Sequence, residues 1–456
     1  MASREITDKY FSSYFKYKEG ILHCESVPVT NIKSWLEKCG ITTSSPVFVY
    51  SKTQIVENVE AYQNALQKLG RPTMLNYAMK ANMNPTLMSI MKDQGCSVTL
   101  VSGLELKLAI QLGFKPENLL LNGNGKQNWE IELAVRNDCM LNIDSLFNLK
   151  QTINVARNLK TRARVLLRVN PDIDPKVHEY ICTGSKETKF GINEEDLDKI
   201  LADIKEEPLI HLIGLHCHIG STITDINVFR ESAIVIYNFY KRLKADGYKH
   251  LNVINLGGGL GINYKQHAAK TSRPDFSHVD TDHVTCIPSP AEVISVIDDV
   301  FGDDNVSLIL EPGRSLIGNS GILVCTVLGV KHGHSQNYIV VDGAMTEVIR
   351  PALYDAYHHI DLAEPSNHRN KDVYNIVGPV CESGDFLGKD RYLSTPHEGC
   401  SLVVFDVGAY CSSMGSNYNM RVHPAEVLIN GRNIDVIRRP DTLDDILTPY
   451  TPVNTL

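Results

Sequence analysis

The stretch "MLNYAMKANMNP" (residues 74–85) has the composition of a short apolar strand that runs into a lysine and then a polar turn. Burying an ammonium group without a partner is costly, so the position of Lys80 needs an explanation. One explanation is a lysine whose head group reaches solvent along a buried stem. The other is an amine held neutral, ready to condense with a carbonyl group. This stretch by itself leaves both open.

Apolar runs of strand length recur through the first two thirds of the chain and alternate with amphipathic segments of helical length. The runs are VFVYS (47–51), MLNYAM (74–79), SVTLV (97–101), LLLNG (119–123), MLNID (140–144), VLLRVN (165–170), LIGLHCHI (212–219), NVINLG (252–257) and SLILEP (307–312). The alternation predicts parallel strands that are buried on both faces. A closed barrel needs eight such strands, and VFVYS is the run we expect to lie outside it.

Polar residues and glycines at the ends of these runs favour a closed barrel over an open sheet. They are Lys80, Ser102, Asn122 with Asn124, Asp144, Arg168 with Asn170, His218, Gly257–Gly259 and Glu311. Polar side chains at the C-terminal ends of many strands are typical of the catalytic mouth of a barrel. An open doubly wound sheet would concentrate them at one switch point. We therefore predict an α/β protein with an N-terminal (β/α)₈ TIM-like barrel.

The helical pattern stops at about residue 320. From there, apolar runs such as NYIVVDG (337–343) and SLVVFDVG (401–408) are separated by Gly, Asp and Asn turns. This pattern predicts a C-terminal, mostly antiparallel β-domain. The polar stretch 265–285 is expected to be a surface excursion.

The bulk composition excludes several classes of protein. The 456 residues are 43% hydrophobic and 21% charged, with a formal net charge of -8 and no long charged run, which argues against a nucleic-acid or membrane-surface partner. No apolar run is long enough to span a bilayer, and residues 1–15 lack the apolar core of a signal peptide. Eleven cysteines without a CxxC pair indicate reduced thiols and a cytoplasmic protein, although a removed targeting segment stays open.

Two glycine-containing motifs follow neighbouring predicted strands. The triplet in NLGGGLGINY (255–264) suits either a tight turn or backbone N–H groups that approach an anion, and Ile262 excludes the GxGxxG pattern. EPGRS (311–315) suits either a surface turn with an ion-paired arginine or a second wall of a phosphate site. In the second case, Glu311 would face the ring of the ligand that carries the phosphate.

Three further motifs carry side chains that could take part in catalysis or binding. In HCHIGS (216–221) both histidines share one strand face, and no further ligands at suitable spacing support a metal site. A flat imidazole could instead stack on an aromatic cofactor. GPVCESGDFLG (378–388) is either a turn held by Ser and Asp side chains or a thiol proton donor beside carboxylates. In RPALYDAYHHI (350–360), Arg350 and Tyr354 have helical spacing, and Arg350 could bind a carboxylate.

Together, these motifs resemble the fold-type III pyridoxal-phosphate decarboxylases, which have an alanine racemase-like barrel, and within them the diaminopimelate decarboxylases. The resemblance runs from YAMKAN (77–82) to GAYCSSMGSNYN (408–419) and includes SGLELKLAIQLGF (102–114) and RVNPDIDPKVHEYICTGSKETKFGI (168–192). It implies a barrel over residues 47–315 and a β-domain built from 1–46 and 316–456. It also implies a head-to-tail homodimer in which each active site is completed by the partner's CESGD loop.

The resemblance assigns a role to each matching residue. Lys80 is similar to the lysine that condenses with the aldehyde of pyridoxal 5'-phosphate, and Glu311 to the carboxylate on the pyridine nitrogen. His218 matches the imidazole that stacks on the ring, and Cys381 matches the proton donor. The remaining cofactor contacts are Ser221, Gly259, Gly313, Arg314 and Tyr410. The substrate contacts are Arg314, Arg350, Tyr354, Tyr410 and Glu382 of the partner subunit.

The implied reaction is decarboxylation of meso-2,6-diaminopimelate to L-lysine and CO₂, the last step of lysine biosynthesis. Ornithine or lysine would leave buried arginines unpaired, which favours a substrate with a second carboxylate. Alternatives on the same scaffold are decarboxylation of ornithine, arginine, carboxynorspermidine or a carrier-bound amino acid, and amino-acid racemisation. A non-catalytic regulatory relative could lack Lys80 or Cys381, and both are present. The family motifs usually have other residues at the positions of Met79, Thr222 and Cys411. These differences leave the fine substrate specificity open.

Overall fold

The computed structural model describes residues 14–41, 46–173, 189–192, 194–265, 286–365 and 370–450. The chain separates into two compact units: one comprises Val56–Ile262 and Cys286–Leu316, and the other Met1–Ile55, Asn263–Thr285 and Ile317–Leu456. Most of the predicted surface excursion, residues 266–285, lies outside the described residues, as do residues 174–188 of the RVNPDIDP motif.

The first unit contains a closed barrel of eight parallel strands, in the order β10-β11-β12-β5-β6-β7-β8-β9, so the predicted fold class is confirmed. The strands are β5 (Thr73–Ala78), β6 (Ser97–Leu100), β7 (Leu120–Leu121), β8 (Met140–Ile143), β9 (Ala163–Arg168), β10 (Ile210–His216), β11 (Val253–Asn255) and β12 (Ser307–Leu310). Closure brings Leu310 of β12 opposite Leu75 of β5. Every residue of β6 and β8 is buried, as the continuous apolar runs predict.

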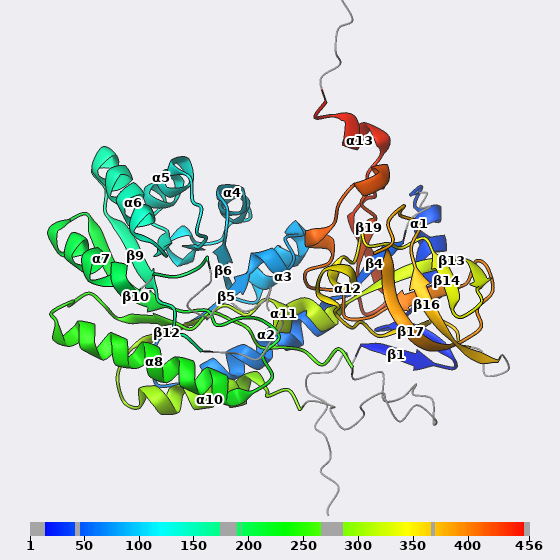
Figure 1. Cartoon of the computed structure of the whole chain (residues 1–456), viewed down its shortest axis with the longest axis horizontal. Helices are drawn as coiled ribbons and strands as arrows, with labels where there is room; N and C mark the ends of the chain where they lie inside the picture. Colours follow the sequence, from blue (N-terminus) through cyan, green and yellow to red (C-terminus); the bar gives the residue numbers. More distant parts are fainter. Residues whose placement is uncertain are drawn as a thin grey trace, which may run out of the picture. The chain divides into compact units, whose positions relative to one another are not determined.

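Helices lie around the barrel strands (Figure 1). They are α2 (Lys52–Leu66), α3 (Pro85–Asp93), α4 (Gly103–Gln111), α5 (Asn128–Arg136), α6 (Leu146–Leu159), α7 (Glu194–Glu206), α8 (Ile226–Ala245) and α10 (Pro290–Phe301). Several begin at a side chain that caps the first turn, because free backbone N–H groups there need acceptors. Ser102 caps α4 by accepting from the N–H of Glu105 at 3.2 Å, so this strand-end residue has a structural role.

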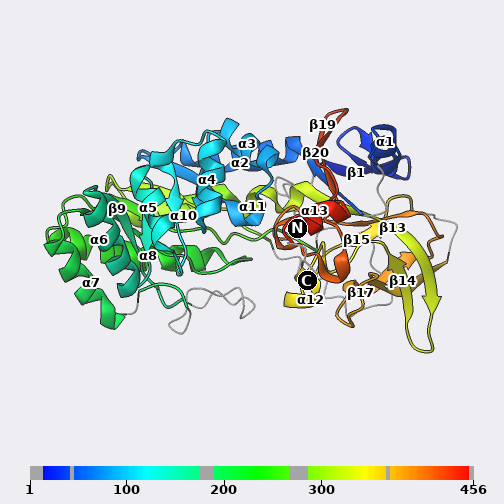
Figure 2. The ribbon, with the colours of Figure 1, turned by 90° about the horizontal axis from the view of Figure 1, so that it is seen from above.

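The second unit is built on a nine-stranded mixed sheet, most of whose strand pairs are antiparallel, as predicted. Its strands are β4 (Val47–Ser51), β13 (Gly321–His332), β14 (Asn337–Val341), β15 (Ile360–Leu362), β16 (Lys371–Val377), β17 (Phe386–Ser394), β18 (Ser401–Val404), β19 (Ala425–Asn430) and β20 (Asn433–Arg438). Figure 2 shows strands of this sheet in a second view of the chain. A three-stranded sheet adds β1 (Phe15–Lys18), β2 (Ile21–Cys24) and β3 (Val27–Pro28). The short helices of this part of the chain are α1 (Ile32–Lys38), α12 (Arg350–Tyr354) and α13 (Leu443–Leu447), and α11 (Arg314–Ile317) follows β12.

Strand β4 is the predicted run VFVYS, and it lies outside the barrel as expected. It pairs antiparallel with β13 and parallel with β19, and all five of its residues are buried. This pairing explains why the boundary between the two units falls after residue 55, whereas the family resemblance implied a barrel region that begins at residue 47.

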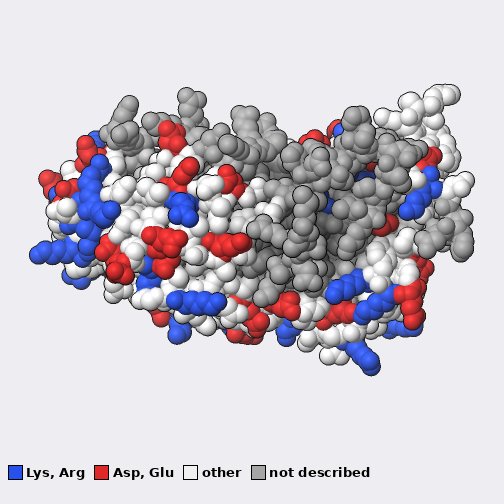
Figure 3. Space-filling model, turned by 90° about the horizontal axis from the view of Figure 1, so that it is seen from below, with Lys and Arg blue, Asp and Glu red and all other residues white. Residues whose placement is uncertain are grey.

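Charged side chains of both signs are present on the face of the molecule in Figure 3. No helix in the described part of the chain combines the length and the apolar composition that crossing a membrane requires.

Candidate active site

Seven of the predicted site residues lie at the C-terminal ends of four neighbouring barrel strands. Lys80 follows β5, Gly259 follows β11, and the other five follow β10 or β12: His218, Ser221, Glu311, Gly313 and Arg314. The barrel order β10-β11-β12-β5 makes the loops after these strands neighbours around the mouth. The structure therefore brings together residues that are up to 234 positions apart, from Lys80 to Arg314.

Lys80 lies in a single 3₁₀ turn, Met79–Ala81, directly after β5. The side chains of Met79 and Ala81 are fully buried, whereas Lys80 is exposed. The chain therefore buries the apolar neighbours and presents the amine at the mouth.

The loop after β12 packs directly against the Lys80 turn. The backbone N–H of Ala78 donates to the carbonyl oxygen of Pro312 at 3.1 Å. A Cβ atom at Gly313 would lie 3.1 Å from the Cβ atoms of both Ala78 and Ala81. A side chain at position 313 would therefore press the two loops apart, which explains why EPGRS carries glycine there.

Glu311 is a buried carboxylate with two neighbours that sequence reasoning missed. Its Oε1 accepts a hydrogen bond from Nδ2 of Asn255 at 2.7 Å, and its Oε2 lies 3.5 Å from Nε2 of the fully buried His216. Burial raises the pKa of Glu311, but the combined effect of His216 and the hydrogen bond from Asn255 is larger and lowers it. The pKa of Glu311 is therefore below its ordinary value. Burial also lowers the pKa of His216. The shared strand face of His216 and His218 is the signal that could have pointed to His216.

His218 presents a neutral imidazole in the loop after β10. Its Nδ1 accepts a hydrogen bond from the N–H of Gly258 at 3.3 Å, so this nitrogen is unprotonated. Burial, and then the positive charge of Lys80, lower the pKa of His218 well below its usual value, while Glu311 acts in the opposite direction. Both groups therefore lie close enough to His218 to affect its charge.

The glycine triplet is required by close contacts in the backbone. A Cβ atom at Gly258 would lie 2.2 Å from the carbonyl oxygen of Glu311. Gly259 has a φ of +113°, and its Cβ would lie 2.6 Å from the carbonyl oxygen of Gly220. The N–H of Ile223 donates to the carbonyl oxygen of Gly259 at 2.9 Å, which joins the loops after β10 and β11.

Ser221 and Arg314 supply polar groups beside this joined pair of loops. Nη2 of Arg314 donates to the hydroxyl oxygen of Ser221 at 3.1 Å. The donors at this place are the guanidinium group, the hydroxyl group and the backbone N–H groups of the glycine turn. Such a set of donors is typical of a phosphate site. With Lys80, His218 and Glu311, these residues fit a phosphorylated pyridine aldehyde.

The other predicted site residues lie in the second unit. Arg350 is the first residue of α12 and is buried, and Tyr354 ends the same one-turn helix, as their spacing predicted. Cys381 and Glu382 are exposed in the loop between β16 and β17, and Tyr410 follows β18 with a φ of +57°. A positive φ is unusual for tyrosine and marks a backbone held by its surroundings.

The CESGD loop combines a structural aspartate with exposed reactive groups. Asp385 accepts hydrogen bonds from the backbone N–H groups of Met345 and Val380, both at 2.7 Å. Asp385 therefore fits the turn-stabilising alternative. The exposed Cys381 and Glu382 side chains leave the proton-donor hypothesis in place.

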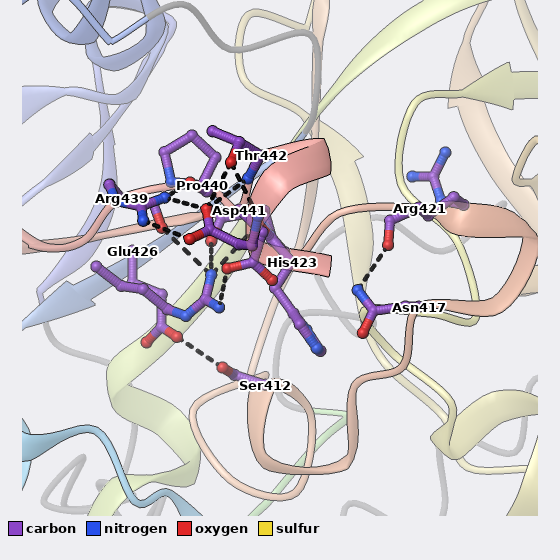
Figure 4. A network of polar contacts seen from close by, with 12 residues as sticks. Ser412, Asn417, Arg421, His423, Glu426, Arg439, Pro440, Asp441 and Thr442 are labelled. Carbon is purple, nitrogen blue, oxygen red and sulfur yellow. Dashed lines mark hydrogen bonds and ion pairs between the residues drawn. The ribbon is translucent and has the colours of Figure 1, made fainter. Parts of the chain in front are cut away.

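The loop 411–424 after Tyr410 is held by its own polar contacts (Figure 4). The hydroxyl of Ser412 donates to Glu426 at 2.7 Å, and Nδ2 of Asn417 donates to the carbonyl oxygen of Arg421 at 2.8 Å. The same loop carries Asn419, whose Oδ1 accepts from the backbone N–H of Cys381 at 2.8 Å. The position of the Cys381 backbone thus depends on this loop.

Comparison with known proteins identifies the family. Residues 52–318 match the family model of the pyridoxal-dependent decarboxylases, pyridoxal binding domain. A probable chloroplastic diaminopimelate decarboxylase of Oryza sativa is 42% identical over 94% of this chain and 83% of its own length. The chain belongs to the diaminopimelate decarboxylases. The matched domain is the pyridoxal-binding domain of these decarboxylases, and the cofactor is pyridoxal phosphate.

Other diaminopimelate decarboxylases support the same assignment. The protein of Aquifex aeolicus is 36% identical over 97% of this chain and 98% of its own length. A solved M. jannaschii diaminopimelate decarboxylase in complex with L-lysine is 32% identical, covers 97% of this chain and 98% of its own, and has a TM-score of 0.84. An arginine decarboxylase of Paramecium bursaria Chlorella virus, at 18% identity and a TM-score of 0.72, shares the fold.

Proposed function

We propose that this chain decarboxylates meso-2,6-diaminopimelate to L-lysine and CO₂ with pyridoxal phosphate. The observation that carries the proposal is that Lys80 and Glu311 follow the adjacent strands β5 and β12 at the mouth of the barrel, and that both affect the pKa of His218. An amine and an anionic carboxylate at one neutral imidazole suit opposite ends of one planar aldehyde.

When bound, pyridoxal phosphate supplies an aldehyde for the amino group of the substrate and a ring that accepts the electron pair released with CO₂. Lys80 would hold the cofactor at its aldehyde through Nζ. Glu311, kept anionic at neutral pH, holds a proton on the ring nitrogen. His218 would contact the ring, and Ser221 and Arg314 would bind the phosphate.

The amino-acid head that does not react sets the specificity. Arg314 and Arg350 suit its carboxylate, and Glu382 of the partner subunit suits its ammonium group. Tyr354 and Tyr410 add contacts to the substrate. A diamine-forming substrate such as ornithine lacks the second carboxylate, and buried donors would then lose their partner.

Cys381 would supply a proton from Sγ to the α-carbon of the substrate. Because the CESGD loop acts on the partner's site in the proposed head-to-tail homodimer, the active sites are shared between two chains. We also propose a cytoplasmic location, since eleven cysteines without a CxxC pair indicate reduced thiols.

Product analysis after incubation with meso-diaminopimelate tests the reaction. We expect equimolar L-lysine and CO₂, and no CO₂ from ornithine, arginine, lysine or carboxynorspermidine at equal concentration. Release of CO₂ from one of these four and not from diaminopimelate would replace the proposed substrate. The visible absorption band of the bound cofactor should shift or vanish in Lys80→Ala, and should remain in Lys52→Ala, a control at the start of α2.

A further inference from the structure

Arg350 is held on two sides by residues to which no role has been given. Its Nη1 lies 2.7 Å from Nε2 of His358, and its guanidinium lies 4.6 Å from the centre of the Tyr264 ring. Only 4% of Arg350 is exposed, and its Nε has no hydrogen-bond partner among the described residues. A buried guanidinium with an unused N–H group has capacity for a further acceptor.

The contacts of His358 define its protonation. A guanidinium can only donate hydrogen bonds, so Nε2 of His358 must be the acceptor. The other ring nitrogen, Nδ1, lies 2.8 Å from the carbonyl oxygen of Phe405, which can only accept. The ring is therefore neutral and carries its proton on Nδ1. The Tyr264 ring meets that of His358 edge-on, at 5.2 Å between ring centres and 74° between the planes.

The nearby acid does not cancel the charge of Arg350. Burial raises the pKa of Asp406 to about 8, although Arg350 lowers it, so the carboxyl group is mostly protonated at neutral pH. Oδ2 of Asp406 is buried and has no hydrogen-bond partner among the described residues. Arg350 thus keeps both its positive charge and a donor, which is the chemistry that recognises a carboxylate.

We propose that His358 is a positioning residue, whose neutral Nδ1–H tautomer holds the Arg350 guanidinium in the orientation that receives the carboxylate of the substrate head that does not react. This inference rests on the proposed function and deepens it, because it assigns the residue that orients the carboxylate receptor. Phe405 anchors the ring through its carbonyl oxygen, and Tyr264 limits the movement of both side chains.

Two substitutions separate the two hydrogen bonds of His358. His358→Gln places an acceptor oxygen near the position of Nε2 and removes the donor to Phe405, whereas His358→Asn keeps a donor near Nδ1 and removes the acceptor for Arg350. His359→Asn is the matched control, since His359 is also buried and its ring packs against Phe405 at 5.3 Å.

The experiment measures L-lysine binding to each holoenzyme by titration calorimetry, with KM and kcat for meso-diaminopimelate alongside. We expect His358→Asn to weaken L-lysine binding and raise KM by about tenfold or more, because a hydrogen bond to a charged group is lost. We expect His358→Gln and His359→Asn to stay within about threefold of wild type. Cofactor absorbance and the melting temperature should be unchanged in all three.

The outcomes distinguish the inference from the function on which it rests. If the wild-type holoenzyme releases no CO₂ from diaminopimelate and binds no L-lysine, the proposed function fails. If the wild type does both and His358→Asn binds L-lysine as tightly as wild type, the positioning role is wrong. An equal loss in the Asn and Gln variants would also overturn it, because the acceptor at Nε2 would then not be the feature that matters.

Discussion

At the scale of single residues, Glu311 is the carboxylate whose charge the proposed chemistry needs. Glu311→Gln keeps the shape and the Asn255 contact but removes the negative charge. We expect a loss of about 10²–10³-fold in kcat with the cofactor still bound, because a preorganised charge that favours the transition state is lost. Radiometric CO₂ release and the visible spectrum of the variant check this.

The control for this substitution is Glu132→Gln, in an exposed i,i+4 ion pair with Arg136, which should have wild-type activity. Normal turnover by Glu311→Gln would show that the ring nitrogen needs no anionic partner in this enzyme.

Asp406 gives a prediction about stability and pH. Its pKa in the folded chain is raised by burial from the ordinary 3.8 to about 8. The folded state therefore binds a proton that the unfolded state releases between these values, so this residue makes stability fall as the pH rises from about 4 to 8. We expect Asp406→Asn to reduce that fall and to be more stable than wild type by about 2 kcal/mol or more at pH 8. Urea unfolding at pH 5 and pH 8 measures the difference.

Asparagine suits this position because Asp406 has a φ of +58°, which asparagine also tolerates. The exposed Asp435→Asn is the control and should leave the pH dependence unchanged. Parallel pH curves for wild type and Asp406→Asn would mean that Asp406 has an ordinary pKa in the folded protein.

At the scale of elements, the loops after β10, β11 and β12 form one unit at the mouth of the barrel. Gly258 lies where the glycine triplet crosses the Glu311 backbone, and a Cβ there would be 2.2 Å from a carbonyl oxygen. We expect Gly258→Ala to destabilise the fold by about 1–3 kcal/mol and to weaken cofactor binding at least tenfold, because the backbone must move. Thermal unfolding and a cofactor titration of the apoprotein test this.

Gly125→Ala is the matched control in the same barrel, since a Cβ there would meet no atom within 4 Å. It should bind the cofactor like wild type. If both alanine variants behave alike, the close approach at Gly258 is not what shapes the phosphate site.

At the scale of the whole molecule, the proposed homodimer predicts complementation. Lys80→Ala and Cys381→Ala should each be inactive or strongly impaired, and a mixture that exchanges subunits should regain activity. If each site takes Lys80 from one chain and Cys381 from the other, random pairing restores about a quarter of the wild-type activity. Assays of the mixed subunits, with sedimentation to show the dimer, check this. A mixture that stays inactive while it dimerises would place both residues in one chain.

Much of the fold could be predicted because parallel strands buried on both faces leave a local pattern. The continuous apolar runs of β6 and β8, and the polar residues after each strand, indicated a barrel before any contact was known. The run VFVYS also looked like a strand, but its partners β13 and β19 lie 270 or more positions along the chain, beyond the reach of any local pattern.

The sequence by itself determined the fold class, the family and the residue types at the mouth of the barrel. These follow from local apolar patterns and from motifs that stay together along the chain. Only the tertiary structure decided that His216 and Asn255 meet Glu311, that Asp385 stabilises a turn, and that His358 contacts Arg350. The physical reason is that such contacts depend on strand register and barrel closure, which set the distance between atoms on separate elements.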